Sequence, residues 1–219
     1  MESLEPVEGQ VVKLGAEAVI TAVNWSGYEL ILKRRVEKRY RRPEIDEAVR
    51  RSRTAHEAKV ITRLRELKIP APAILFLDLS SSSIYMQRIK GQELRSVLTT
   101  TPDEQLVNLA ENLGRIVGRM HKGGVAHGDL TLANIIIDDR GRPWLVDFGL
   151  SVFTTELEDM AVDIHLLDRS LESTAPEKRE QFMRGFLRGY EEEAGRGEAR
   201  AMLSKISEIR SRGRYVERG

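Results

Sequence analysis

The sequence contains no cysteine among its 219 residues, which excludes a disulfide framework and any thiolate metal site. It also lacks any stretch approaching the roughly 18 consecutive apolar residues that a membrane-spanning helix needs. Residues 1–10, MESLEPVEGQ, are acidic and contain no apolar core of a secretory signal. We therefore expect a soluble cytoplasmic protein that is not bound to a membrane.

An overall excess of one charge is also missing, because the net charge is only +1. The charges are unevenly placed, however. Residues 33–53 carry ten basic and four acidic residues, and residues 196–219 carry seven basic and three acidic residues. Such segments are usually solvated surface, and the alternative is contact with nucleic-acid phosphates.

The most informative stretch runs from His127 to Gly149 and reads HGDLTLANIIIDDRGRPWLVDFG. It contains the carboxylate of Asp129, the carboxamide of Asn134 and the carboxylate of Asp147. These groups fit a phosphoryl-transfer site, in which one carboxylate faces the accepting hydroxyl and two oxygen ligands hold magnesium. The alternative is a buried polar hairpin in which Asp and Asn only form turns.

A short hairpin explains how Asn134 and Asp147 could meet. Residues 135–137 are three isoleucines, residues 138–141 have the composition of a turn, and residues 144–146 form a second apolar run. Two antiparallel strands joined by this turn would bring the residues that flank them to the same end. The sequence therefore predicts a single metal site there.

The pattern HxD, then Asn five residues after the Asp, then Asp-Phe-Gly resembles the catalytic and metal-binding loops of the protein-kinase-like superfamily. Most protein kinases have Arg where this chain has Gly128, and that Arg commonly receives the phosphate of an activation loop. The HGD variant instead resembles RIO kinases, aminoglycoside and choline phosphotransferases, and the small atypical kinase of the KEOPS complex. Control by activation-loop phosphorylation is therefore not expected.

The N-terminal part predicts strands at residues 11–22 and 28–33, followed by a helix at about residues 44–67. By resemblance to kinases, Lys33 would hold ATP phosphates, with Arg34 and Arg35 as alternative positions. The helix sequence RTAHEA resembles that of the KEOPS kinase and makes Glu57 the partner of Lys33. On the residues alone, Lys33 could be a solvated strand end and Glu57 a solvated helix residue.

The resemblance also implies the walls of an adenine pocket. A hairpin of residues 74–77 and 84–89 leads into Lys90-Gly91, as a kinase hinge does. Met86 would lie at the back, with the Gln87 carbonyl and the Ile89 amide bound to adenine, and with Ile31 above and Ile136 below the ring. Gly15 would lie in the loop that covers the phosphates. That loop has a single glycine, which is too little for a firm motif and also fits a plain strand bend.

After Gly149 only 70 residues remain, and no Ala-Pro-Glu motif closes a peptide-binding activation segment. Residues 158–165 resemble the KEOPS kinase segment that follows Asp-Phe-Gly. By this resemblance Asp163 would be the buried carboxylate that accepts backbone amides from the catalytic loop, its alternative being a helix N-terminal Asp. Helices are expected at residues 176–193 and 198–210. Residues 210–219 are basic and too rich in glycine to be helical throughout.

The resemblance covers nearly the whole chain and identifies it as a member of the PRPK family, the small atypical kinase and ATPase of the archaeal and eukaryotic KEOPS complex. It implies an α+β, minimal bilobal kinase-like fold without an extended activation segment. The expected parts are an N-terminal antiparallel-sheet lobe (residues 1–89), a reduced helical C-terminal lobe (90–209) and a basic tail (210–219).

Family membership implies a Ser/Thr kinase or ATPase that uses ATP and Mg²⁺ and supports threonylcarbamoyladenosine formation in tRNA. The implied roles are phosphate binding by Lys33 with Glu57, metal binding by Asn134 and Asp147, and proton acceptance or water orientation by Asp129. The implied partners are the threonylcarbamoyl-transferase subunit, other KEOPS subunits and tRNA. The alternatives are a RIO-type kinase of ribosome assembly, and a non-catalytic ATP-binding scaffold for tRNA and protein.

Overall fold

The computed structural model describes residues 9–216 and divides the chain into two compact units. The first unit comprises residues 1–63 and 72–89, and the second comprises residues 64–71 and 90–219. The first unit thus ends at residue 89, and residues 64–71 belong to the second unit. The predicted division into functional lobes and a tail stays a prediction. No helix in the described part of the chain is long and apolar enough to cross a membrane.

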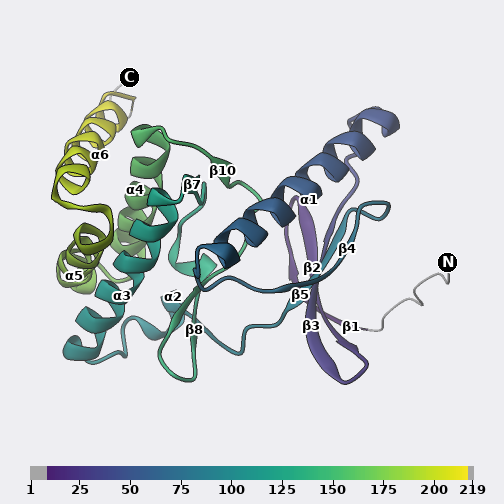
Figure 1. The fold of residues 1–219 in the computed structure, drawn as a ribbon, viewed down its shortest axis with the longest axis horizontal. Helices are drawn as coiled ribbons and strands as arrows, with labels where there is room; N and C mark the ends of the chain where they lie inside the picture. The colour runs from purple at the N-terminus through teal and green to yellow at the C-terminus, as the bar shows by residue number, and fades with distance from the viewer. Residues whose placement is uncertain (1–8, 217–219) are drawn as a thin grey trace. The chain divides into compact units, whose positions relative to one another are not determined.

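The first unit is a five-stranded antiparallel sheet in the order β1-β2-β3-β5-β4, with helix α1 across one face (Figure 1). The turn between β2 and β3 consists of Ser26 and Gly27, both with positive φ (50° and 84°). Two such residues form the type I′ turn whose twist matches that of the paired strands. The elements are β1 (Gly9–Leu14), β2 (Ala18–Trp25), β3 (Tyr28–Arg35), α1 (Pro43–Glu66), β4 (Ile74–Asp78) and β5 (Ser83–Gln87).

Helix α1 ends through its backbone before the prolines that follow it. Lys68 adopts a left-handed conformation (φ 56°), and the Ile69 amide donates to the Leu64 carbonyl at 2.9 Å. This bond satisfies a carbonyl of the last turn, and the buried side chains of Leu64 and Ile69 accompany it. The turn at Lys68 therefore already ends the helix before Pro70 and Pro72.

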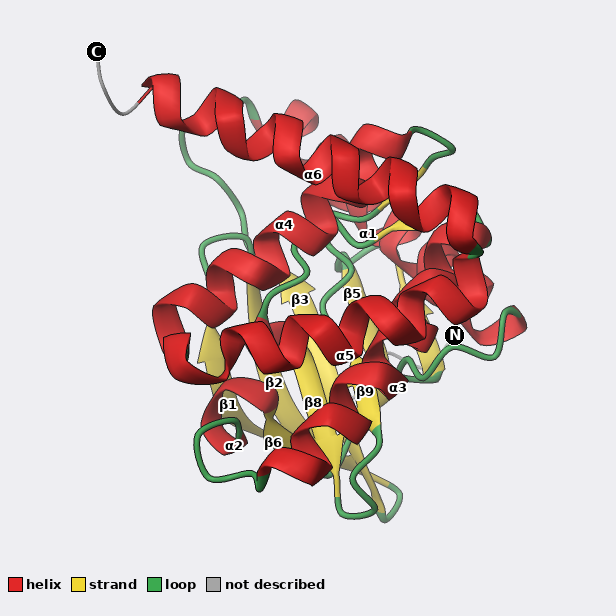
Figure 2. Ribbon diagram, turned by 90° about the vertical axis from the view of Figure 1, so that its left-hand side faces the viewer, coloured by secondary structure: helices red, strands yellow, loops and turns green. Residues whose placement is uncertain are grey.

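The second unit is mainly helical, as predicted. Figure 2 shows its long helices, with α3 and α5 side by side, and the fold therefore matches the expected α+β class. The helices are α2 (Leu94–Val97), α3 (Asp103–Lys122), the 3₁₀ turn η1 (Leu132–Asn134), α4 (Leu157–Thr174), α5 (Pro176–Ala194) and α6 (Arg196–Val216). The short strands are β6 (Gly91–Glu93), β7 (Val125–Ala126), β8 (Ile135–Asp138), β9 (Pro143–Leu145) and β10 (Val152–Phe153).

Two short sheets in this unit include or flank parts of the stretch from His127 to Gly149. Strands β6, β8 and β9 form one sheet, in which Ile135 pairs with Leu145. Strands β10 and β7 form the other, in which Val152 pairs with Ala126. The β8–β9 pairing is the hairpin that the isoleucine run and the turn residues predict, and Asn134 lies directly before it.

Glycines let α3 and α5 approach until their backbones touch. A Cβ atom on Gly114 would lie 2.0 Å from the Phe186 carbonyl oxygen, and one on Gly189 would lie 1.9 Å from the Glu111 carbonyl oxygen. Side chains at either position would therefore separate the helices. This close contact brings the buried ring of Tyr190 on α5 against α3.

Helix α6 extends beyond Arg210, where the sequence predicts the end of the last helix. It continues through Gly213 to Val216, so a basic segment expected to be irregular is largely helical. Arg210 is fixed by its ion pair with Asp168 on α4, which also accepts two bonds from Arg179. Residues 217–219, the rest of the predicted tail, lie outside the described residues.

Candidate functional site

In the first unit, a buried carboxylate on α1 binds two cations from β3. Glu57 accepts a bond from the Lys33 ammonium at 2.5 Å and one from the Arg35 guanidinium at 2.7 Å. The three side chains are at most 7 % exposed. The Lys33–Glu57 pair is the one that the sequence predicts, and its role toward a nucleotide stays a prediction.

The strand register separates the three basic residues that end β3. Lys33 and Arg35 are buried on the same face, while Arg34 is exposed on the other, because successive side chains of a strand alternate. Arg35 was considered only as an alternative to Lys33, and its position two residues later was the signal for a shared face. Two buried cations from one face of β3 therefore meet at the single carboxylate of Glu57.

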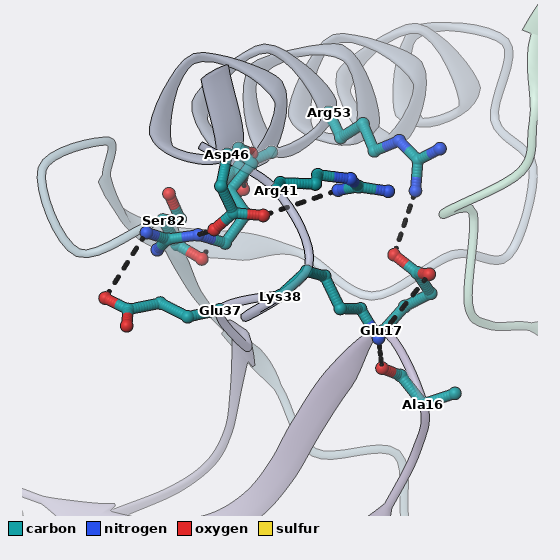
Figure 3. Close-up of polar contacts among 10 residues, drawn as sticks. Ala16, Glu17, Glu37, Lys38, Arg41, Asp46, Arg53 and Ser82 are labelled. Carbon is teal, nitrogen blue, oxygen red and sulfur yellow. Dashed lines mark hydrogen bonds and ion pairs between the residues drawn. The ribbon is translucent and has the colours of Figure 1, made fainter. Parts of the chain in front are cut away.

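The loop with the single glycine is tied down by side chains from the basic segment. Gly15 lies in the turn between β1 and β2, where its amide bonds the Ala18 carbonyl at 2.9 Å. Figure 3 shows Glu17 of this turn bound to Arg53 at 2.9 Å, while Lys38 donates to the Ala16 carbonyl. These contacts replace the glycine-rich flexibility of a typical kinase loop with a braced turn.

Other basic residues of this segment bind acidic residues in the same unit. Asp46, at the start of α1, is buried and accepts Arg50 at 2.7 Å and Arg41 at 3.4 Å (Figure 3). Burial opposes ionisation, but the bonds from Arg50 and a backbone amide lower the pKa of Asp46 below its ordinary value. Arg42 and Arg51, in contrast, are exposed. The ten basic residues of this segment are therefore not equally available to a partner.

The predicted adenine-binding residues fall in both units. Met86 on β5 is buried against Ala58 of α1, with Ile31 of β3 packed beside it. The Gln87 amide donates to the Ala73 carbonyl at 2.8 Å. Ile89 is partly exposed at the end of the first unit, and Ile136 belongs to the second unit, where it pairs with Trp144. Adenine binding by this set stays a prediction.

In the second unit, Asn134 holds Asp129. The Asn134 side-chain nitrogen donates to the Asp129 carboxylate at 2.8 Å and to the Asp129 carbonyl at 2.8 Å. Because the nitrogen of the carboxamide is used in this way, its oxygen is the atom left to bind a metal. Asn134 is buried, which fixes both groups.

The β8–β9 hairpin brings Asn134 beside the segment that contains Asp147. The Val146 amide donates to the Asn134 carbonyl at 3.0 Å, so the residue that precedes Asp147 is bonded to Asn134. Asp147 has φ 66°, a left-handed conformation that is costly for a residue with a side chain. Such strain is often found at functional sites, and the fully buried side chain of Phe148 anchors the segment.

His127 links the two halves of this loop. Its Nε2 lies 3.2 Å from the Val146 carbonyl, which can only accept, and the Asp129 amide donates to Nδ1 at 3.3 Å. The ring is therefore neutral, with its proton on Nε2. Burial lowers the pKa of His127 below its ordinary value, although nearby carboxylates, above all Asp163, act in the opposite direction.

The structure explains why this chain has glycine at position 128. Gly128 has φ 78°, and a Cβ atom there would lie 2.1 Å from the Leu150 carbonyl oxygen. Any side chain would meet both strain and a clash with backbone. The departure from the arginine of most kinases therefore follows from the short segment that packs Leu150 against the loop.

Asp163 on α4 holds the backbone of the same loop, as predicted. Its carboxylate accepts the His127 amide at 2.6 Å and the Gly128 amide at 2.8 Å. A third bond joins it to His121 Nε2 at 3.1 Å. The carboxylate is fully buried, so these donors take the place of water. The sequence did not indicate the contribution of His121.

The segment after Phe148 is short and bonded along much of its length. The Ser151 hydroxyl donates to the Phe148 carbonyl at 2.6 Å, and β10 pairs with β7. Thr154 then bonds Asp159 at 2.7 Å at the start of α4. The chain thus passes from the Asp-Phe-Gly to α4 without an extended activation segment, in agreement with the predicted fold.

The candidate metal ligands number only two from the protein. Within residues 9–216, no three His, Asp or Glu side chains form a group that could hold a metal. Mg²⁺ in phosphoryl-transfer sites is usually bound by one or two protein groups together with substrate phosphates and water. The Asn134 carboxamide and the Asp147 carboxylate fit that kind of site, in which the nucleotide completes the coordination.

Comparison with known proteins gives two consistent findings. The protein kinase domain family matches residues 17–177. The KEOPS complex subunit Bud32 of Pyrococcus abyssi is 38 % identical over 95 % of this chain and 97 % of its own length. The probable serine/threonine-protein kinase BUD32 homolog of Archaeoglobus fulgidus is 35 % identical over 94 % of this chain and 97 % of its own length.

Two further similarities are partial. The probable bifunctional tRNA threonylcarbamoyladenosine biosynthesis protein of Methanosphaera stadtmanae is 37 % identical over 92 % of this chain, which spans only 36 % of that protein. The solved Rio2 kinase of Chaetomium thermophilum has a TM-score of 0.57 and 17 % identity, covering 95 % of this chain and 74 % of the other. The latter similarity supports the kinase-like fold alone.

The buried neutral His127 predicts a loss of stability in mild acid. Its pKa is lower in the folded chain than the ordinary 6.5, so below that pH the unfolded chain binds more protons and stability falls as pH falls. Urea unfolding at pH 7.5 and 5.5 should show a lower free energy of unfolding at pH 5.5. The difference should shrink in a His127→Asn variant, and an equal difference would contradict this role of His127. His56→Asn, on α1, is the matched control.

Proposed function

This chain belongs to the Bud32 family of protein kinases, and on that premise we propose that it binds ATP with Mg²⁺ as the kinase and ATPase subunit of a KEOPS complex. A kinase domain implies nucleotide binding. The observation that carries the proposal is that each unit by itself holds one fixed cluster of the predicted residues. One is the Lys33–Glu57 ion pair, and the other is Asp129 held by Asn134 beside the segment of Asp147.

Lys33 would bind the ATP phosphates, with Glu57 keeping its ammonium in place. Arg35 places a second buried cation on the same carboxylate, and phosphates are ligands that such side chains can bind. The buried Arg35 Nε also has no hydrogen-bond partner among the described residues. The turn at Gly15, braced by its neighbours, would cover the phosphates as a fixed lid. Adenine would lie against Met86 and between Ile31 and Ile136, bound by the Gln87 carbonyl and the Ile89 amide.

Asn134 and Asp147 would hold Mg²⁺, which supplies charge neutralisation of the phosphates when it is bound. Asp129 would accept the proton of a Ser or Thr hydroxyl or orient an attacking water. Its carboxylate is already held by the Asn134 side chain, so it is aimed before substrate arrives. Kinase and ATPase activity would therefore use the same residues.

ATP hydrolysis is the reaction that the segment after Phe148 favours. This segment reaches α4 at Leu157 through one turn and the short strand β10, so no extended surface for a peptide substrate is formed there. We infer that hydrolysis within the complex matters more than phosphorylation of a dedicated protein substrate.

The names of the relatives support the proposed partners. A KEOPS subunit name at 38 % identity supports assembly with other KEOPS subunits. A bifunctional protein for threonylcarbamoyladenosine in tRNA contains a region like this chain within about a third of its length. This supports a partner that transfers the threonylcarbamoyl group, and hence a role in tRNA modification in the cytoplasm. A RIO-type function has weaker support, because this chain is only 17 % identical in sequence to the solved Rio2 kinase.

We predict that Asp129→Asn keeps nucleotide binding and lowers ATP turnover by the assembled complex at least about a hundredfold, the usual contribution of a positioned base. Binding should be measured by calorimetry and turnover by phosphate release. The matched control is Asp139→Asn, the same change at an exposed hairpin position. Unchanged turnover in Asp129→Asn would favour a non-catalytic ATP-binding scaffold.

Contact with tRNA should depend on the basic residues that are exposed. We expect the double change Arg42→Gln and Arg51→Gln to reduce the slope of log affinity against log salt by up to about one unit per lost phosphate contact. The control removes the same charge from exposed positions of the second unit, Arg140→Gln with Arg184→Gln. Equal slopes for the wild type and the double variant would show that Arg42 and Arg51 are solvated surface residues that make no phosphate contact.

A further inference from the structure

A chain of buried polar side chains reaches from α5 to the catalytic loop. The Tyr190 hydroxyl lies 3.0 Å from His121 Nδ1, and His121 Nε2 lies 3.1 Å from the Asp163 carboxylate. Each of the three residues is at most 2 % exposed. The two rings meet edge to face, with centroids 5.6 Å apart. The three side chains are thus isolated from solvent, so their hydrogen bonds must be satisfied within the protein.

The close approach of α3 and α5 fixes the spacing between Tyr190 and His121. Gly114 and Gly189 let the helix backbones touch, and Tyr190 follows Gly189 directly. On α3, Gly118 faces the Tyr190 backbone, and its Cβ would lie 3.1 Å from the Tyr190 carbonyl oxygen. His121 lies one turn further along α3. Movement of Tyr190 away from His121 would therefore require separation of the two helices.

The direction of the hydrogen bonds follows from the groups at the two ends. Burial raises the pKa of Tyr190 well above its ordinary value, so its hydroxyl keeps its proton and can donate to His121 Nδ1. In a neutral imidazole, Nδ1 is then the acceptor and the proton on Nε2 is donated to Asp163, whereas an imidazolium would donate from both nitrogens with the Tyr190 hydroxyl as acceptor. The reverse tautomer would place a nitrogen lone pair against the carboxylate.

Asp163 therefore receives three donors, and the third depends on Tyr190. The other two are the amides of His127 and Gly128, which lead directly into Asp129. If the His121 ring lost its fixed tautomer, the carboxylate would lose a donor and could reorient. The two amides and the residue that follows them would then be held less firmly.

We propose that Tyr190 is a positioning residue for the catalytic loop: by donating to His121 it selects the tautomer that keeps Asp163 aligned beneath Asp129. The proposal rests on the proposed role of Asp129 in ATP turnover. The hydrogen bonds that lead from Tyr190 to the loop pass through His121 and Asp163, so its effect on Asp129 is indirect.

The test is Tyr190→Phe in the full-length chain, which removes the hydroxyl and keeps the ring. Long-range ¹H–¹⁵N NMR of the imidazoles should show wild-type His121 as the single Nε2-protonated tautomer, and a mixture of tautomers in the variant. In the complex assembled with partner subunits, kcat for ATP hydrolysis should fall about fivefold, the scale of one hydrogen bond. KM for ATP should change less than twofold. Tyr85→Phe, on β5, is the matched control and should change neither reading.

His121→Gln supplies the second variant, because its amide nitrogen can still donate to Asp163 but has no tautomer to select. In that background, Tyr190→Phe should cause no further fall in kcat, since the effect of Tyr190 passes through the imidazole. Equal effects of Tyr190→Phe in both backgrounds would overturn the proposal. So would a wild-type His121 that is protonated on Nδ1, alone or together with Nε2, or a tautomer that is unchanged in Tyr190→Phe.

The two proposals can fail separately. If Asp129→Asn retains full turnover, the proposed role of Asp129 fails, and the positioning of a catalytic residue by Tyr190 fails with it, even where the tautomer shifts as expected. If Asp129→Asn is inactive but Tyr190→Phe has a normal tautomer and normal kcat, only the role of Tyr190 is overturned.

Discussion

A buried carboxylate surrounded by donors organises the predicted functional residues within each of the two units. In the first unit Glu57 holds Lys33 and Arg35, and in the second unit Asp163 holds the amides of His127 and Gly128. Removal of one partner from a buried ion pair typically costs about 3 to 5 kcal/mol, far more than a surface ion pair contributes. Glu57 can therefore hold the long side chains of Lys33 and Arg35 in one geometry. Asp163 can do the same for the backbone of His127 and Gly128.

Local contacts also hold two loops that are mobile in many other kinases. The turn at Gly15 is braced by Lys38 and Arg53. In the segment after Phe148, the Ser151 hydroxyl donates to the Phe148 carbonyl, and strand β10 pairs with β7. Both loops are therefore short and held by contacts within their own units.

Residue patterns made the catalytic stretch and its hairpin predictable because the chemistry is local. Asp129, Asn134 and Asp147 lie within 19 consecutive residues, and the turn and strand residues between them show how they meet. The role of Asp163 as an acceptor of backbone amides was predicted through the family resemblance. Lys33 and Glu57 required a family resemblance, because 24 residues separate them.

Features that depend on close approach of distant segments could not be read in this way. The buried position of Arg35 depends on which face of β3 meets α1, and Gly128 is explained only by the backbone of Leu150. Helix α6 continues past Gly213, although local composition predicts an end near Arg210. The contact of Tyr190 with His121 likewise arises from two helices that pack through glycine.

The most direct test of the account is whether one metal–nucleotide complex binds both to Lys33 and to the pair Asn134 and Asp147. Paramagnetic Mn²⁺ with a non-hydrolysable ATP analogue would broaden the NMR signals of backbone amides close to the metal. The account predicts strong broadening at Asn134 and Asp147, together with broadening and a nucleotide-dependent shift at Lys33. Broadening confined to the second unit, with the Lys33 signal unchanged when nucleotide is added, would contradict it.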